Sequence, residues 1–269
     1  SRRLLIRELL EMSTYKGWEA EEQIAVDYLE TCRSAVADDE IFAKFKSLQG
    51  YKNILEHVTP RQGAEYLQVA MEMAEDALLE NLEAFKENDT IGTPDRFSYP
   101  ETGKISPTTI RYIKNVFEMA TLLGESPISR VVEVGGGYGG LCKTLSVVCD
   151  FDEYILVDLP EAVAVQEKYL KNFPELYAKC KFIPCDELEE VKDVDLFISN
   201  YALSECDYDT QVNYYDKLVA NSKFAYIIYN LVNFNDFYYN KFTEKMSERF
   251  EFTKSKDYEN TLILAKVKL

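Results

Sequence analysis

Residues 133–140, EVGGGYGG, decide the fold of this chain. They follow the apolar pair Val131-Val132 and precede residues 141–148, whose composition predicts a helix. Glycines let the backbone turn tightly and let a ligand approach where a Cβ atom would clash. The first N–H groups of the helix then point at that ligand. Strand, glycine turn and helix in this order predict a binding site for a nucleotide-type cofactor.

Two cofactors fit the spacing of the glycines. Gly135, Gly137 and Gly140 satisfy the dinucleotide pattern G-x-G-x-x-G. Glu133 with Gly135, Gly137 and Gly139 satisfies E-x-G-x-G-x-G, the pattern of class I methyltransferases that use S-adenosylmethionine (SAM). An acid at the end of the strand favours SAM, because it answers the α-ammonium of the cofactor and would repel a pyrophosphate.

An acid at the end of the next strand is expected for either cofactor, since it holds the ribose hydroxyls. The run YILVD at residues 154–158 supplies Asp158, about 20 residues beyond the loop as the fingerprint requires. Glycines alone fit a plain tight turn. The loop together with both acids predicts a SAM site.

Composition limits the partners of the chain. Its 269 residues are 46% hydrophobic and carry a formal charge of −17, which argues against nucleic acid and anionic membranes. We see no apolar run as long as a membrane span and no signal-peptide pattern, and we expect a cytoplasmic enzyme. His57 is the only histidine and no C-x-x-C pair occurs, so we predict no zinc site. A need for Mg²⁺ stays open, because Asp207 and Asp209 are acidic neighbours in the sequence.

The chain divides into two predicted regions. Residues 1–96 form a helical extension, whose clearest helix spans about 63–85, followed by a loop over 89–107. We expect that helix to pack on the main domain; a lid over the substrate or a homodimer contact is the alternative. Residues 97–269 form the second region, which opens with a helix capped by Ser106 and starting at Pro107.

Strands and helices alternate from residue 128 onward. Strands are predicted at about 130–134, 153–157, 181–184, 194–199 and 224–229, with a closing hairpin from 249–253 and 261–267. This alternation predicts an α/β fold: a doubly wound, Rossmann-like sheet, mostly parallel, with a C-terminal antiparallel hairpin. That order is typical of class I methyltransferases and not of dinucleotide dehydrogenases.

Four segments carry a resemblance to a known family. They are VVEVGGGYGGLCKTL (131–145), SPTTIRY (106–112), VDLPE (157–161) and FISNYALSE (197–205). Together they resemble the sugar O-methyltransferase family, over residues 97 to the C-terminus. The resemblance implies methyl transfer from SAM to a sugar hydroxyl, on a free, nucleotide-linked or glycan-bound sugar such as a deoxyhexose.

The strand ends place the cofactor, because ligands of open α/β sheets lie beyond the carboxyl ends of the strands. We expect the glycine loop at the methionine part, Asp158 at the ribose, the acids after the third strand at the adenine, and Asn200 near the sulfonium. The predicted cofactor residues are Glu133, Gly135, Gly137, Tyr138, Gly139, Asp158, Leu159, Asp186, Glu187 and Asn200. A solvated acidic pair is the alternative for Asp186 and Glu187, and a cap is the alternative for Asn200.

Methyl transfer is an in-line displacement that needs an aligned acceptor oxygen and a base. The catalytic candidates are Glu205, Asp207 and Asn200, although Glu205 fits a helix cap equally well. His57 lies outside the resemblance and is expected to be structural or exposed.

Polar and aromatic side chains near the predicted site suit a polyol. The substrate candidates are Tyr201, Arg111, Asn233 and Asn235. A surface ion pair is the alternative for Arg111. Three rival functions stay open: a methyltransferase for another small molecule, an NAD-dependent oxidoreductase, and a non-catalytic SAM-binding module of a larger glycan-assembly protein.

Overall fold

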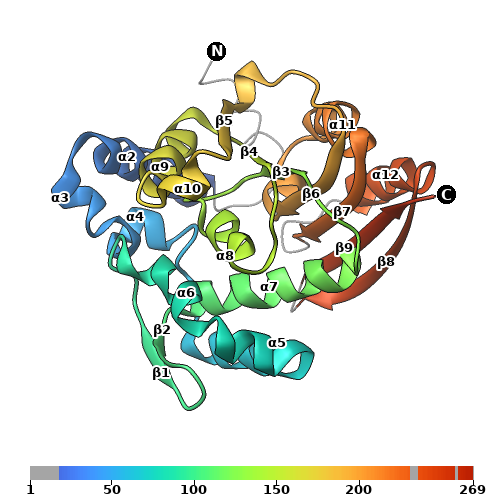
Figure 1. The fold of residues 1–269 in the computed structure, drawn as a ribbon. Helices are drawn as coiled ribbons and strands as arrows, with labels where there is room; N and C mark the ends of the chain where they lie inside the picture. Colours follow the sequence, from blue (N-terminus) through green and yellow to red (C-terminus); the bar gives the residue numbers. More distant parts are fainter. Residues whose placement is uncertain (1–17, 231–235, 258–259, 269) are drawn as a thin grey trace.

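A seven-stranded sheet forms the centre of the computed structural model, which describes residues 18–230, 236–257 and 260–268 (Figure 1). The strand order is β5-β4-β3-β6-β7-β9-β8, and β9 runs antiparallel to both of its neighbours. The strands are β3 Arg130–Val134, β4 Glu153–Asp158, β5 Cys180–Pro184, β6 Val194–Asn200, β7 Ser222–Tyr229, β8 Phe250–Asp257 and β9 Asn260–Val267. The predicted mostly parallel sheet with a C-terminal hairpin is confirmed.

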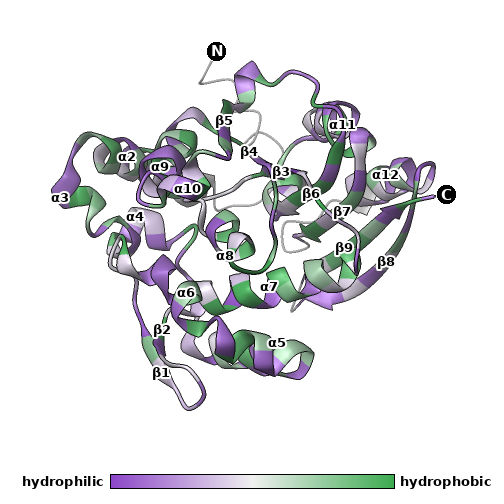
Figure 2. Cartoon of the chain, viewed as in Figure 1, coloured by the Kyte–Doolittle hydropathy of each residue, from purple (hydrophilic) through white to green (hydrophobic). Residues whose placement is uncertain are grey.

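Both faces of the sheet are covered by helices, because the side chains of each strand alternate between them. Val131, Leu196 and Phe224 face the core under α7, α8 and α9, while their chain neighbours Val132 and Phe197 face the core under α11 and α12. Figure 2 shows the resulting apolar centre of the sheet. The covering helices are α7 Pro107–Leu123, α8 Gly140–Val148, α9 Pro160–Leu170, α11 Tyr208–Lys217 and α12 Asp236–Ser247.

Short elements connect this framework. They are α10 Pro174–Tyr177, η3 Cys185–Glu187, η4 Ala202–Glu205 and η5 Val219–Asn221. The last of these follows α11, which ends as an α-helix at Lys217.

The N-terminal region is helical from Trp18 onward; the part of this prediction before Trp18 lies outside the described residues. In Figure 1, α2 lies beside α9 and α5 beside α7. A capping box of Thr59 and Gln62 starts α5, and a non-helical residue, Ala74, interrupts it. The elements are α2 Trp18–Ala37, α3 Asp39–Phe42, η1 Phe45–Ser47, α4 Gln49–Lys52, α5 Pro60–Glu80, α6 Leu82–Lys86 and η2 Glu87–Thr90.

The predicted loop over residues 89–107 contains a small hairpin instead. Strands β1 Phe97–Tyr99 and β2 Gly103–Ile105 pair antiparallel. Gly103 closes the turn with a φ of 68°, a conformation that favours glycine. Each strand has three residues, and only Tyr99 and Ile105 are buried. The sequence therefore shows no alternation of apolar and polar residues from which a strand could be predicted.

Buried polar contacts fasten the N-terminal region to the α/β domain. The Asn88 side chain donates to Thr144 Oγ1 at 2.7 Å and accepts a hydrogen bond from the Tyr169 hydroxyl. Asp89 accepts hydrogen bonds from Ser106 and Thr109 at the start of α7. Because the partners belong to both regions, the extension and the sheet domain share one buried network.

The helices that the structure describes include none that is both long and apolar enough to cross a membrane.

Candidate functional site

A cavity of about 820 Å³ opens at the carboxyl ends of β3, β4 and β6. Ligand sites of small molecules have volumes of this order. One wall comes from the strand ends and the other from the N-terminal region. Of the predicted site residues, the cavity is lined by Gly135, Gly137, Asp158, Leu159, Asp186, Asn200, Tyr201, Glu205, Asp207 and Arg111.

The glycine loop needs its glycines for two physical reasons. Gly135 and Gly137 have φ values of 79° and 58°, which L-residues with side chains rarely adopt. A Cβ atom on Gly135 would lie 2.2 Å from Cβ of Ala202, and one on Gly137 would lie 3.3 Å from the Leu55 side chain. The loop therefore passes close to η4, the turn after β6, and to the N-terminal region while keeping its backbone at the cavity.

Asp158 ends β4 at the cavity and is fastened to the glycine loop. Its carboxylate accepts hydrogen bonds from the Leu159 N–H and from Gln166 Nε2, both at 2.8 Å, and from the Gly137 N–H. Burial raises the pKa of this carboxyl to about 6, against the effect of these donors. A carboxylate has about four acceptor positions, so Asp158 retains capacity for a ligand hydroxyl.

The end of β6 combines an unpaired amide with a strained residue. Asn200 lines the cavity, and its buried Oδ1 has no hydrogen-bond partner in the described part of the chain. It caps no helix through its side chain. Tyr201 follows with a φ of 71°, a conformation that costs a residue other than glycine about 1–3 kcal/mol. Strain and an unsatisfied buried atom at one position are typical of a binding site.

The two acidic catalytic candidates differ in their engagement. Asp207 is the N-cap of α11, and its carboxylate accepts hydrogen bonds from the Thr210 N–H at 2.7 Å and the Thr210 hydroxyl at 3.0 Å. Glu205 is accessible from the cavity, and its side chain is hydrogen-bonded to Asn230. The surrounding protein atoms raise the pKa of Glu205 above its ordinary value, which makes its carboxylate a stronger base.

The N-terminal region supplies the opposite wall of the cavity. We call this group the extension wall; its residues are Ala25, Tyr28, Leu29, Ile54, Leu55, His57, Val58, Gln62 and Tyr66. His57 therefore faces the same cavity as Glu205. Partial burial and the charge of Arg111 lower the pKa of His57 below its ordinary value, so its imidazole is neutral at neutral pH.

Several predicted residues lie away from the cavity. Glu133 is 2% exposed, does not line the cavity, and accepts a hydrogen bond from the Tyr154 hydroxyl at 2.8 Å. Burial raises its pKa to about 7. The Glu133 carboxylate thus lies beside Tyr154 and beneath Gly136 of the glycine loop, and its contact with a ligand ammonium stays a prediction.

Tyr138 likewise lies in the core and does not line the cavity. It is fully buried among aromatic rings. The centroid of its ring lies 4.9 Å from that of Tyr169 and 3.9 Å from Lys46 Nζ. Gly139 starts α8 as a left-handed N-cap behind the cavity. Glu187 is exposed and does not line the cavity either. Asn233 and Asn235 lie outside the described residues.

Some lining or supporting residues escaped the sequence reasoning. Leu55, Gln62 and Tyr66 lie in a region without a motif, so no pattern marked them. Gln166 lies on α9, is fully buried, and joins Asp158 to the Gly137 carbonyl. Its spacing of eight residues from Asp158 at the head of a helix is the one signal that could have marked it.

In the described ranges, no three His, Cys, Asp or Glu side chains gather as metal ligands would. The cavity residues fit SAM in three respects. Gly135 and Gly137 leave space that side chains would fill, Asp158 presents a carboxylate beyond β4, and Asn200 has a free acceptor. The fold is that of the class I SAM-dependent methyltransferases, by strand order and by the position of the glycine loop.

Comparisons with solved structures return proteins of this class. The ribosomal protein L11 methylase from Lactobacillus delbrueckii subsp. bulgaricus is 12% identical, with 60% of this chain and 80% of that chain covered and a TM-score of 0.40. A mitomycin 7-O-methyltransferase is 11% identical, with coverage of 81% and 70% and a TM-score of 0.44. The methyltransferase domain of a bacterial Hen1 is 12% identical, with coverage of 57% and 97% and a TM-score of 0.45.

No family model matches this sequence. No curated protein matches it. Similarity this low does not extend to substrate or reaction, which must be argued from the site.

Proposed function

We propose that this protein is a SAM-dependent methyltransferase acting on a hydroxyl group of a sugar. One observation carries the proposal: Gly135, Gly137, Asp158 and Asn200, from three strand ends, line a single cavity. Ligands of open α/β sheets bind at this edge. When bound, SAM supplies an electrophilic methyl group on a sulfonium.

The charges of the cavity favour SAM over a dinucleotide. Its lining carboxylates are those of Asp158, Asp186, Glu205 and Asp207, against one guanidinium, that of Arg111, among the described lining residues. Four acids suit a cationic sulfonium and ammonium and oppose a pyrophosphate. We propose that these four carboxylates balance the positive charge of the cofactor, which the motif alone assigned to Glu133.

The neutral part of the lining suits a polyhydroxylated acceptor. Amide and phenol groups of Gln62, Asn230, Asn260, Tyr66 and Tyr201 line the cavity. Such groups donate and accept hydrogen bonds and offer aromatic faces to C–H surfaces. The net charge of −17 disfavours RNA as the acceptor. A cytoplasmic location and a homodimer belong to the proposal as expectations.

Glu205 is proposed as the general base. Its carboxylate takes the proton of the acceptor hydroxyl as the oxygen attacks the methyl carbon, while the side chain of Asn230 orients it. Asp207 is less suited, because the α11 cap engages both of its oxygens. The extension wall closes the cavity over the glycine loop through Leu55, which limits the access of water.

Calorimetric titration with S-adenosylhomocysteine and, separately, NAD⁺ tests the cofactor. We expect the intact chain to bind S-adenosylhomocysteine, Asp158→Ala to lose that binding, and Asp150→Ala to retain it, because Asp150 is exposed and pairs with Lys179. Binding of NAD⁺ alone would refute the proposal. Transfer of labelled methyl from SAM to sugar and non-sugar acceptors then tests the acceptor; cofactor binding without any turnover would leave the non-catalytic module.

A further inference from the structure

Arg111 is a buried cation that faces the cavity and has no ion-pair partner among the described residues. It lies in the first turns of α7, its side chain lines the cavity, and the residue is 7% exposed. No carboxylate of the described residues lies within 4.0 Å of its guanidinium, the limit for an ion pair. The surface ion pair considered from the sequence is therefore not formed.

The surroundings of Arg111 are mainly aromatic. The guanidinium carbon lies 5.7 Å from the ring centroids of both Tyr112 and Tyr201. Glu56 interacts electrostatically with Arg111. Glu56 interacts more strongly with Lys46, and Thr108 also hydrogen-bonds to it. The positive charge of Arg111 is thus only partly balanced by the protein.

Lys114, three residues further along the same helix, shows the opposite arrangement. It is 4% exposed, and its Nζ lies 2.7 Å from Asp257 and 2.9 Å from Glu118. The protein therefore pairs the buried cation that faces the core and leaves the one that faces the cavity unpaired. The two cations are almost equally buried, so depth of burial does not explain why Lys114 is ion-paired and Arg111 is not. They differ in that Arg111 lines the cavity.

Leaving a buried guanidinium unpaired is costly. The group stays protonated in proteins, so it cannot shed its charge as a lysine can. Burial removes water from it, and the rings of Tyr112 and Tyr201 with a hydrogen bond to the Tyr112 side chain replace part of that hydration. A hydrogen-bonded anion would supply the missing charge. Its planar fork of donors matches the two oxygens of a carboxylate or of a phosphate.

We propose that Arg111 is the anchor for an anionic oxygen group, a carboxylate or a phosphate, of a ligand bound in this cavity. The proposal deepens the proposed function and rests on it for the identity of the ligand. Two sources carry that chemistry: the carboxylate on the methionine part of the cofactor, or an acidic group of the sugar acceptor. An acidic cavity with one guanidinium suits a ligand that carries both a cation and an anion.

The first experiment titrates S-adenosylhomocysteine and 5′-methylthioadenosine into the intact chain and into Arg111→Met. Methylthioadenosine lacks the amino-acid part, so it reports on the adenosine site alone and on folding of the variant. If the cofactor is the source, we expect roughly 30-fold weaker binding of S-adenosylhomocysteine and unchanged binding of methylthioadenosine. Arg111→Lys should recover part of the loss, because it keeps the charge without the fork.

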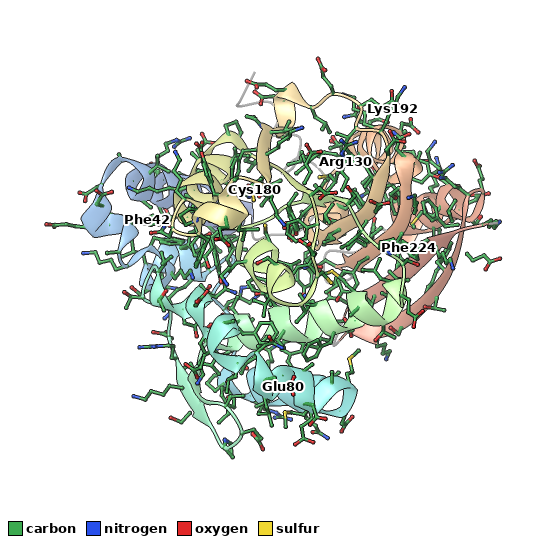
Figure 3. All side chains as sticks on the ribbon, viewed as in Figure 1. Phe42, Glu80, Arg130, Cys180, Lys192 and Phe224 are labelled. Carbon is green, nitrogen blue, oxygen red and sulfur yellow. The ribbon has the colours of Figure 1, made fainter. Side chains whose placement is uncertain are left out.

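The second experiment adds glucuronate, glucose 1-phosphate and glucose to the protein saturated with S-adenosylhomocysteine. If the acceptor is the source, the intact chain binds one of the two anionic sugars more tightly than glucose, and Arg111→Met loses that preference. Arg130→Met is the matched control. Arg130 starts β3 at the opposite end of the strand from the cavity, beside Lys192 (Figure 3), and pairs with Glu153.

An Arg111→Met variant indistinguishable from the intact chain in both experiments overturns the anchor. Failure of the proposed function looks different, because then the intact chain itself binds neither S-adenosylhomocysteine nor methylthioadenosine.

Discussion

The two walls of the cavity differ in origin and in chemistry. The strand-end wall consists of glycines and acids that follow β3, β4 and β6, whereas the extension wall consists of apolar, aromatic and neutral polar side chains from before residue 67. The first resembles what any enzyme of this fold needs for a cofactor. No sequence motif marks the second. Its amide and phenol groups, such as those of Gln62 and Tyr66, are the kind that could bind an acceptor.

The residues proposed for the cofactor and those proposed for the acceptor are separated in the sequence but line one cavity. Leu55 touches the glycine loop, and Tyr66 is hydrogen-bonded to Tyr201 of the strand-end wall. The extension is thus part of the site and not only a helical layer on the domain. Four predictions test which wall does what, from the largest expected effect to the smallest.

The base is expected to come from the strand-end wall. Glu205→Gln should lower kcat roughly 10²–10⁴-fold, since an amide cannot take the proton of the acceptor. His57→Gln should act mainly on KM, because its imidazole lies on the extension wall. Steady-state kinetics with the acceptor found in the sugar screen measure both.

The pH profile adds a direction to this prediction. Because the surrounding protein atoms partly desolvate Glu205 and raise its pKa, the rate of the intact chain should fall on acidification through a value above 4.5, and Glu205→Gln should lack that limb. A large kcat loss in His57→Gln, with Glu205→Gln near normal, would transfer the base to the extension wall.

Gly135 tests the close approach between the glycine loop and η4. Gly135→Ala should weaken binding of S-adenosylhomocysteine roughly 100-fold, because the added Cβ meets Ala202 at 2.2 Å and the φ of 79° is strained. Gly103→Ala is the matched control: its φ is 68° and nothing lies within 4 Å. It should cost about 1 kcal/mol of stability and leave cofactor affinity intact. Equal affinity losses in both variants would contradict the steric argument.

Glu133 has two proposed roles, a contact with the cofactor ammonium and a buried contact with Tyr154. Its stability profile and cofactor affinity distinguish them. Its pKa is about 7 when folded and ordinarily 4.5, so stability falls as pH rises from 4.5 to 7 and the penalty stays constant above that. Glu133→Gln removes the penalty and should be more stable by about 3 kcal/mol at pH 8, with no difference near pH 4.

Denaturant unfolding across pH measures this effect, and calorimetry should find cofactor affinity changed less than threefold. Glu153→Gln should show the opposite sign, since Lys181 and Arg130 lower the pKa of Glu153 and the charge stabilises the fold above that pKa. A tenfold loss of cofactor affinity in Glu133→Gln would show instead that Glu133 takes part in binding the cofactor.

Leu55 carries the smallest expected effect. Leu55→Ala removes the side chain that covers Gly137 and should weaken binding of S-adenosylhomocysteine roughly fivefold by exposing the loop to water. Leu79→Ala, at a position 43% exposed on α5, should leave affinity unchanged. If both variants bind like the intact chain, the extension wall takes no part in holding the cofactor.

Local patterns in the sequence determined the α/β architecture. The apolar runs around residues 130–134 and 194–199 predict buried parallel strands, and the structure has β3 and β6 there. Loop positions with positive φ favour glycine, so the glycine pattern predicted the turn after β3. The spacing from that turn predicted Asp158 at the end of the next strand. Ser106 was also predicted as the cap of α7, and it accepts the Thr109 N–H. These features depend on near neighbours in the chain.

Tertiary structure alone decided which side chains meet. Strand alternation turned Glu133 into the core, the aromatic cluster enclosed Tyr138, and the α11 cap engaged Asp207. His57 lies at the cavity because the segment just before α5 is held beside α7 by the packing of α5 on that helix. Arg111, its cavity neighbour on α7, is more than 50 residues away along the chain. Such contacts depend on how distant segments pack, and no local pattern encodes them. The motif therefore defined a cofactor loop, and the packing of the extension defined the rest of the site.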